Sequence, residues 1–207
     1  MEFVKIDVNK SGTAIYIMTT EITQKQWESV MGNNPSIKKG DRLPVEMVTW
    51  LDTQEFCKKL SVLENGIYRL PTDEEWKKAA VEGLPSDIKN NIQELRRYAW
   101  IMDDGGTDAH RGSHEVATKK PSAIGIYDML GNVQEWCADK HVRGGSFLHT
   151  IGACLPTDES ERVSARPESF AANDLGFRVI YEKPTEGTAE RGNSSKANKT
   201  LKHDKQE

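Results

Sequence analysis

The second half of the chain, from Ala99 onward, consists of short apolar pieces between glycine-rich turns, and it lacks a long apolar stripe of helical spacing. This pattern predicts loops and small strands on a compact scaffold rather than further long helices. Two pieces, "HVRGGSF" and "LGFRVIYE", are expected to be the last two strands. Residues 11–23, rich in Ile, Thr and Tyr, are expected to form a strand near the start.

The first half carries clear helix signals. Thr23 and Gln26 have capping-box spacing, and Gly32 is a stop signal, so a helix is expected between them. Thr72 and Glu75 repeat the capping-box spacing ahead of a stripe made by Trp76, Ala79 and Ala80. A third helix is expected within residues 49–63, with an apolar side formed by Trp50, Phe56, Cys57, Leu60 and Leu63.

Composition excludes several classes of protein. The chain has 207 residues and a net charge of -4, so one domain of ordinary size is expected, with no general nucleic-acid binding, which needs a basic face. No apolar run approaches the roughly 18 residues of a membrane span. The first residues lack the basic-then-apolar pattern of a signal peptide, so a cytoplasmic or otherwise non-secreted protein is expected.

The cysteines and the last residues complete this outline. Cys57, Cys137 and Cys154 lack metal-ligand spacing, and their odd number favours free thiols. Residues 183–207 contain one large apolar side chain, Leu201, which cannot offset the entropy lost on ordering. The predicted organisation is a domain over residues 1–182 and a disordered polar tail over residues 183–207.

Six separated motifs occur in one order: "TQKQWESVMGNNPS", "LPVEMVTWLDTQEFCKKL", "YRLPTDEEWKKAA", "GIYDMLGNVQEWCAD", "RGGSF" and "LGFRV". Together they resemble the sulfatase-modifying-factor family, which includes the formylglycine-generating enzymes, from about Ile15 to about Val179. The resemblance implies an α+β, C-type-lectin-like fold, rich in loops, with small and mostly antiparallel sheets and two to three packed helices. Because this family contains enzymes and non-enzymes, function must be argued at the site.

The resemblance also implies where an oxidase site would lie. The family enzymes bind copper(I) with two cysteines that stand three and eight residues after the serine of "GGS", and thiolates suit this soft ion. In this chain the serine is Ser146, and the two positions hold His149 and Cys154. Two more departures occur: Gln134 stands where the enzymes carry tryptophan, and the connection over residues 137–143 is short. The site resembles a copper oxidase site that has lost one metal thiol.

A calcium site is implied as well, formed by the side chains of Asp128 and Glu135 and the carbonyls of Gly131 and Val133. Calcium prefers carboxylate and backbone oxygens in a tight loop. The alternative is that Gly131 is part of an ordinary turn and that Glu135 pairs with an arginine such as Arg178. Calcium would have a structural role.

Residues 147–174 form a long polar stretch between two expected strands, and such loops on a rigid scaffold commonly carry binding. Diversified variable proteins of the same family place ligand contacts in this stretch. The main hypothesis is therefore a non-catalytic, lectin-like domain that binds a protein or glycan partner. The candidate ligand-binding residues are His149, Thr150, Asp158, Glu159, Arg162, Arg166, Phe170 and Asn173.

Two enzyme hypotheses remain beside it. The first is a copper-dependent, formylglycine-generating-type oxidase acting on a cysteine of a peptide substrate, with Cys154 and His149 as metal ligands and Ser146 positioning oxygen. The second is part of a non-haem iron enzyme of the ergothioneine type. That enzyme type needs a histidine-rich helical domain, whereas this chain has 5 histidines. The iron hypothesis ranks last.

Overall fold

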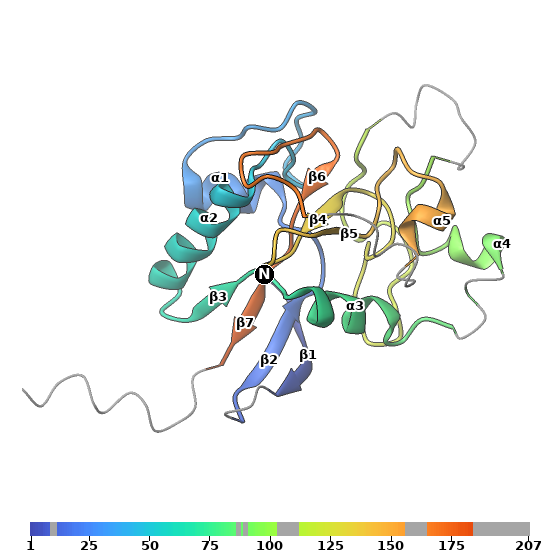
Figure 1. The fold of residues 1–207 in the computed structure, drawn as a ribbon, viewed down its shortest axis with the longest axis horizontal. Helices are drawn as coiled ribbons and strands as arrows, with labels where there is room; N and C mark the ends of the chain where they lie inside the picture. Colours follow the sequence, from blue (N-terminus) through green and yellow to red (C-terminus); the bar gives the residue numbers. More distant parts are fainter. Residues whose placement is uncertain (9–11, 86–87, 89–90, 103–111, 156–164, 184–207) are drawn as a thin grey trace, which may run out of the picture.

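Two small sheets and three helices of two turns or more form the scaffold of the computed structural model, which describes all residues except 9–11, 86–87, 89–90, 103–111, 156–164 and 184–207 (Figure 1). The strands are β1 (Phe3–Val8), β2 (Ala14–Met18), β3 (Ile67–Arg69), β4 (Gln134–Trp136), β5 (Val142–Arg143), β6 (Leu175–Gly176) and β7 (Ile180–Glu182). The helices are α1 (Gln24–Met31), α2 (Trp50–Leu63), α3 (Asp73–Val81) and the single turns α4 (Ile92–Leu95) and α5 (Ile151–Cys154).

The four-stranded sheet has the order β1-β2-β7-β3 and is antiparallel throughout. The three-stranded sheet has the order β5-β4-β6, in which β4 pairs antiparallel with β5 and parallel with β6. This arrangement is the expected loop-rich α+β fold, with one parallel pair among its antiparallel ones. In Figure 1 the small sheet lies between the α1–α2 pair and the loop-rich part that holds α4 and α5.

The helix signals are confirmed. The Thr23 side chain accepts the Gln26 N–H, and Gly32 ends α1 in the left-handed conformation at φ 76°. Thr72 and Glu75 form the expected capping box of α3. In α2 the buried side consists of Thr53, Phe56, Cys57 and Leu60, whereas Leu63 is 64% exposed. The prediction for Leu63 is wrong because the last turn of α2 continues past the residues that cover the core.

An aromatic cluster joins the helices to the C-terminal strands. Trp27 of α1 stacks on Phe56 of α2 with ring centroids 5.4 Å apart, and Phe177 meets both rings edge-on. A second cluster packs the predicted α3 stripe of Trp76, Ala79 and Ala80 against the four-stranded sheet. These clusters bury large apolar side chains, so they fix α1, α2 and α3 against the sheets.

The strands are shorter than their patterns indicate. "LGFRVIYE" splits into β6 and β7, which lie in different sheets, because Arg178 between them is fully buried and bonds to the carbonyls of Met18 and Tyr127. "HVRGGSF" yields only β5, because Gly144 and Gly145 leave extended geometry at φ 89° and φ 64°. The strand expected in residues 11–23 is β2, whereas β1 had no prediction.

Candidate functional site

A hydrogen-bonded network surrounds Ser146, directly after the Gly144–Gly145 turn. The buried Ser146 hydroxyl donates to Asp174 Oδ2 at 2.7 Å and accepts the Leu148 N–H at 3.1 Å. His149 Nδ1 lies 2.7 Å from the same hydroxyl. Because Ser146 gives its one proton to the carboxylate, His149 must donate from Nδ1. Ser146 therefore fixes both the position and the tautomer of the His149 ring.

Gln134 belongs to this network. Its side-chain nitrogen donates to Asp174 Oδ2 at 3.1 Å, and its backbone N–H donates to the Asp174 carbonyl at 2.7 Å. Two residues that depart from the enzyme pattern, Gln134 and His149, are thus tied to the same carboxylate. Sequence reasoning missed Asp174, whose one available signal was its place immediately before "LGFR".

A cavity of about 70 Å³ lies beside this network. His149 and Gln134 line it together with Lys77 of α3 and Arg143 of β5. The other described residues of the lining, which are apolar or glycine, are Trp76, Val142, Gly144, Gly145, Ala153 and Leu155. Of the site residues predicted around "GGS", His149 lines this pocket, and Ser146 contacts it through the His149 ring.

Cys154 is placed differently from His149. It is 1% exposed and packs with Leu95, Tyr98 and Leu130. Its sulfur would lie 2.4 Å from a Cβ added at Gly145, so the thiol sits directly against that glycine. The structure thus buries Cys154 in an apolar cluster, while His149 lines the pocket.

The calcium candidates lie in a second, buried polar cluster. Glu135 accepts from Arg178 Nη2 at 2.7 Å, from Arg178 Nε at 2.8 Å and from Trp76 Nε1 at 2.8 Å. Both oxygens of Glu135 are therefore engaged, and a cation beside them would face the Arg178 guanidinium. This is the pairing given above as the alternative to calcium, and Glu135 as it stands does not fit as a calcium ligand.

Asp128 does fit a cation. It is buried at φ 56°, and its Oδ2 accepts the Ala117 N–H at 2.7 Å. Its Oδ1 has no hydrogen-bond partner among the described residues. Burial raises the pKa of Asp128 to about 6. Gly131 and Val133, the two carbonyl candidates, are buried in the turn that follows.

Glu21 is a third acidic residue of this cluster that sequence reasoning missed. Its Oε1 accepts from Asn132 at 3.0 Å, whereas its buried Oε2 has no hydrogen-bond partner in the part of the chain that the structure describes. Burial, followed by the charge of Asp128, raises its pKa well above the ordinary value. Glu21 and Asp128 thus place two further carboxyl groups around the Arg178–Glu135 pair, and Asp128 is the one of them whose carboxylate could bind a cation.

Calcium is expected to stabilise the protein through Asp128. At about tenfold above its Kd, a ligand adds about 1.4 kcal/mol, a rise in Tm of roughly 3–6 °C for a domain of this size. Asp128→Asn should abolish the rise, because asparagine tolerates the left-handed backbone but lacks the charge. Differential scanning calorimetry with calcium, after metal extraction, measures this. An unchanged Tm would contradict calcium binding at Asp128.

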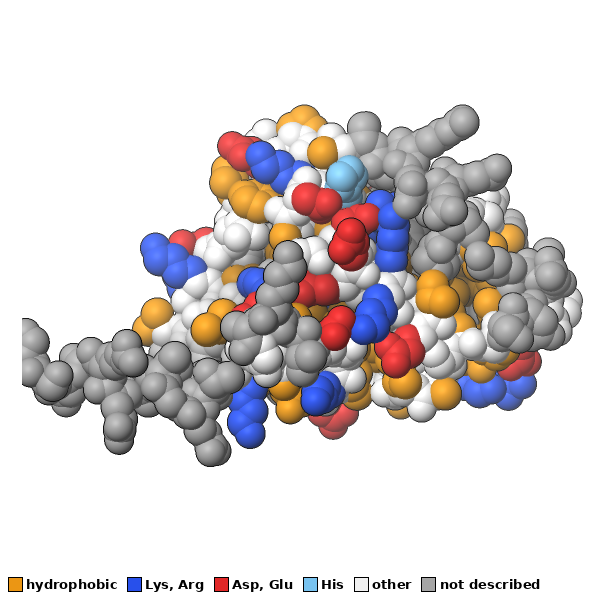
Figure 2. All heavy atoms as spheres, turned by 60° about the horizontal axis from the view of Figure 1, so that its bottom comes forward, with side chains coloured by type: hydrophobic (Ala, Val, Ile, Leu, Met, Phe, Trp, Pro, Cys, Tyr) orange, Lys and Arg blue, Asp and Glu red, His pale blue; other side chains and the backbone are white. Residues whose placement is uncertain are grey.

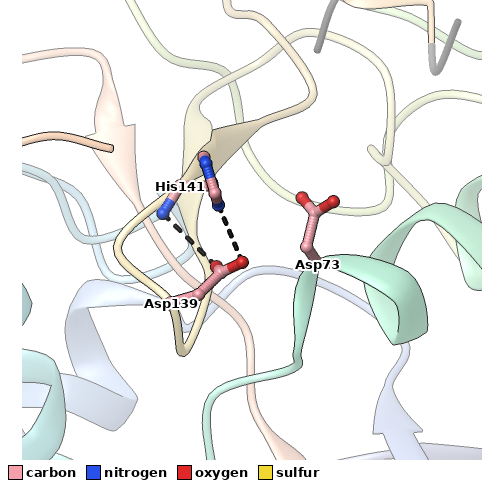
Figure 3. A group of neighbouring side chains, drawn as sticks. All are labelled: Asp73, Asp139 and His141. Carbon is pink, nitrogen blue, oxygen red and sulfur yellow. Dashed lines mark hydrogen bonds and ion pairs between the residues drawn. The ribbon is translucent and has the colours of Figure 1, made fainter. Parts of the chain in front are cut away.

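A third group of polar side chains lies near the pocket. Asp139 and His141, in the short connection before β5, hydrogen bond to each other at 2.7 Å, and Asp73 faces them from the first turn of α3 (Figure 3). Asp73, however, already pairs with Arg143 and with Lys77 at 3.1 Å. Burial acts to raise the pKa of Asp73, but hydrogen bonds from these two cations outweigh it and lower the pKa. A further cation would have to compete with both.

The predicted ligand-binding residues separate into groups. His149 lines the pocket, and Thr150 is the exposed N-cap residue of α5. Arg166 lies over the Phe170 ring at 5.4 Å, and its N–H donates to the Lys140 carbonyl, beside the shortened connection. Asn173 is exposed next to Asp174. Asp158, Glu159 and Arg162 lie outside the described residues, as does the predicted tail from residue 184.

The charges on the surface are relevant to nucleic-acid and membrane partners. On the face that Figure 2 shows, acidic and basic side chains alternate rather than gather into a patch of one sign. Among the described residues, none of the helices is both long and apolar enough to cross a membrane.

Comparisons with known proteins decide the family. Residues 2–183 match the sulfatase-modifying factor enzyme 1-like domain. The chain belongs to this family. The match extends the resemblance of residues 15–179 in both directions.

Relatives of this sulfatase-modifying-factor domain differ in their descriptions. The chaperone protein LppX of Paenibacillus barcinonensis is 33% identical over 86% of this chain and 83% of its own length. The inactive C-alpha-formylglycine-generating enzyme 2 of Mus musculus is 31% identical, and the match covers 73% of this chain and 53% of that protein. Among solved structures, Treponema denticola variable protein 1 has a TM-score of 0.73 and 28% identity, covering 82% of this chain and 85% of its own.

Proposed function

We propose that this chain is a non-catalytic, lectin-like binding domain that recognises a protein or glycan partner around the pocket and the loop of residues 147–174. The observation that carries the proposal is the network of Gln134, Ser146, His149 and Asp174. It uses the residues that depart from the oxidase pattern to build a pocket wall.

The position of Cys154 supports the same proposal. Copper(I) prefers thiolate ligands, and here one of the two positions is an imidazole whose Nδ1 is bound to Ser146. The remaining thiol, Cys154, is buried in a cluster with apolar side chains, whereas His149 lines the pocket, so the two are not presented together to a ligand there. Relatives described as an inactive enzyme and as a chaperone agree with a function other than oxidation.

Copper binding separates this proposal from the oxidase alternative. The reduced protein is expected to bind copper(I) no more tightly than Cys154→Ser, and to consume no oxygen with a peptide that carries a cysteine. Titration against a competing copper(I) chelator measures the first, and an oxygen electrode measures the second. Tight one-to-one binding that Cys154→Ser abolishes would restore the oxidase hypothesis, with His149 as the second ligand.

A further inference from the structure

The outer face of α2 presents several large apolar side chains to solvent. Leu51, Val62 and Leu63 are 50%, 78% and 64% exposed. Exposed apolar side chains that stand singly are normal on a protein surface, whereas a group of them on one element marks an interaction site. In Figure 1 α2 lies at the end of the molecule opposite to α4 and α5.

This face is also hollowed. A groove of about 300 Å³ lies between α1 and α2. Val30 of α1 and Val62 and Leu63 of α2 give it apolar walls. The other described residues of the lining are Glu55, Lys58 and Lys59. The groove is therefore apolar with a charged border, as a site for an apolar side chain of a protein partner would be.

Four exposed residues on α2 are arranged symmetrically about one point of the helix. Leu51, Glu55, Lys58 and Val62 follow each other in steps of four, three and four residues, which keeps them in one stripe. Leu51 and Val62 lie about 8 Å on either side of the midpoint, and Glu55 and Lys58 lie about 2 Å on either side. The stripe is therefore apolar at both ends, with one acidic and one basic residue at its centre.

The two central charges are available to a partner. Lys58 forms no ion pair within the described part of the chain. Glu55 pairs with Lys59 at 3.8 Å, and the side chains of that pair are 47% and 44% exposed. Exposed pairs of this kind are weak, so a partner could engage Glu55 without a large loss.

We propose that this face of α2 binds the same face of a second copy of the chain, with the two α2 helices antiparallel. A two-fold axis through the midpoint of the stripe places Leu51 opposite Val62 of the second copy, and Glu55 opposite Lys58 of the second copy. Each contact then occurs twice, as in any isologous interface. The groove beside Val62 receives Leu51 of the second copy.

The symmetry of the stripe is the reason for choosing a second copy as the occupant. A helix of another protein could bind to any arrangement of these residues, whereas a two-fold axis requires an acidic and a basic residue at equal distances from the midpoint. A parallel pair of α2 helices would place Glu55 beside Glu55 and Lys58 beside Lys58, and these like charges would repel. The pattern therefore favours an antiparallel pair of identical chains.

The expected dimer is weak. Stable interfaces bury at least about 1,000 Å², and α2 has only 14 residues, of which one face is exposed. We expect a dissociation constant on the order of 100 μM. The inference is independent of the proposed binding function, because the pocket next to α5 lies away from α2 (Figure 1).

Sedimentation equilibrium of the full chain, up to about 500 μM, tests the inference through the two charges. Glu55→Lys and Lys58→Glu should each weaken the wild-type dimer roughly tenfold, because each change places two like-charged pairs in the interface. An equimolar mixture of the two variants should associate again. In that mixture one chain carries two basic residues at positions 55 and 58, and the other chain carries two acidic ones.

Further variants separate this effect from others. Glu82→Lys makes the same charge change at the exposed C-cap of α3 and should leave the dimer intact. Val62→Gln should weaken the dimer roughly tenfold, because it removes an apolar contact that occurs twice. Thermal unfolding of each variant should match that of the wild type within a few degrees, because the replaced side chains are exposed.

Several outcomes would overturn the inference. A wild-type chain that stays monomeric at the highest concentration would leave this face to a different protein. A dimer that Glu55→Lys does not weaken would form through another surface. Equal weakening by Glu82→Lys would indicate an effect of net charge alone. If the mixture of Glu55→Lys and Lys58→Glu stayed monomeric, the two residues would not face each other across a two-fold axis.

Discussion

Replacing Arg178 with methionine is expected to lower the free energy of unfolding by about 3–5 kcal/mol, because it leaves the buried Glu135 carboxylate without its cation. Arg178 is 0% exposed and bonds to both Glu135 oxygens and to the carbonyls of Met18 and Tyr127. Its loss also removes the donor to the carbonyls of Met18 and Tyr127, which adds to the cost.

Urea denaturation measures this effect against a surface control. Arg42→Met removes an exposed pair with Glu115, whose atoms are 3.1 Å apart, and should cost no more than about 1 kcal/mol. Adding Glu135→Gln to Arg178→Met should recover part of the loss, because the unpaired charge is gone. If Arg178→Met lowered the free energy of unfolding no more than Arg42→Met does, another group would have to neutralise Glu135.

Replacing Gly131 with alanine is expected to cost at least about 4 kcal/mol or to prevent folding, an effect in the exceptional range for one substitution. The added Cβ would lie 2.0 Å from the Trp100 carbonyl oxygen, which accepts the Asn132 N–H at 2.8 Å. That oxygen belongs to the backbone and cannot move aside as a flexible side chain could.

The matched control is Gly32→Ala at the end of α1. Gly32 has φ 76° and Gly131 has φ 82°, but a Cβ at Gly32 meets no atom within 4 Å. Gly32→Ala should therefore cost only the left-handed backbone strain of roughly 1–2 kcal/mol. Equal losses in the two variants, measured by thermal unfolding, would show that the clash at Gly131 is relieved and that backbone strain alone acts.

Local signals were readable from the sequence because their partners are near in the chain. The capping boxes of Thr23 and Thr72 each involve a residue three positions on, and both are present. The burial of Trp76 followed from helical spacing in the same way. The family motifs added the α+β architecture, which no local pattern contains.

The chemistry of the site could be predicted less well from the sequence, because it depends on contacts between residues that are far apart in the chain. Glu21 meets Asn132 across 111 positions, and Asp174 meets Gln134 across 40. Neither acidic residue belongs to a local pattern of candidate ligands. Lys77 was not predicted as a pocket residue for a different reason. In the sequence it is one more polar residue of α3, and only the structure places it beside Arg143 and the Gly144–Gly145 turn.

The position of β7 has a consequence for synthesis of the protein. β7 pairs with β2 on one side and with β3 on the other, so the four-stranded sheet lacks an inner strand until Ile180–Glu182 leave the ribosome. Until then β2 and β3 present unpaired edges, which are templates for association with other chains. Such long-range pairing also slows folding. Before β7 has been added, association with other chains at these edges therefore competes with folding of the nascent chain.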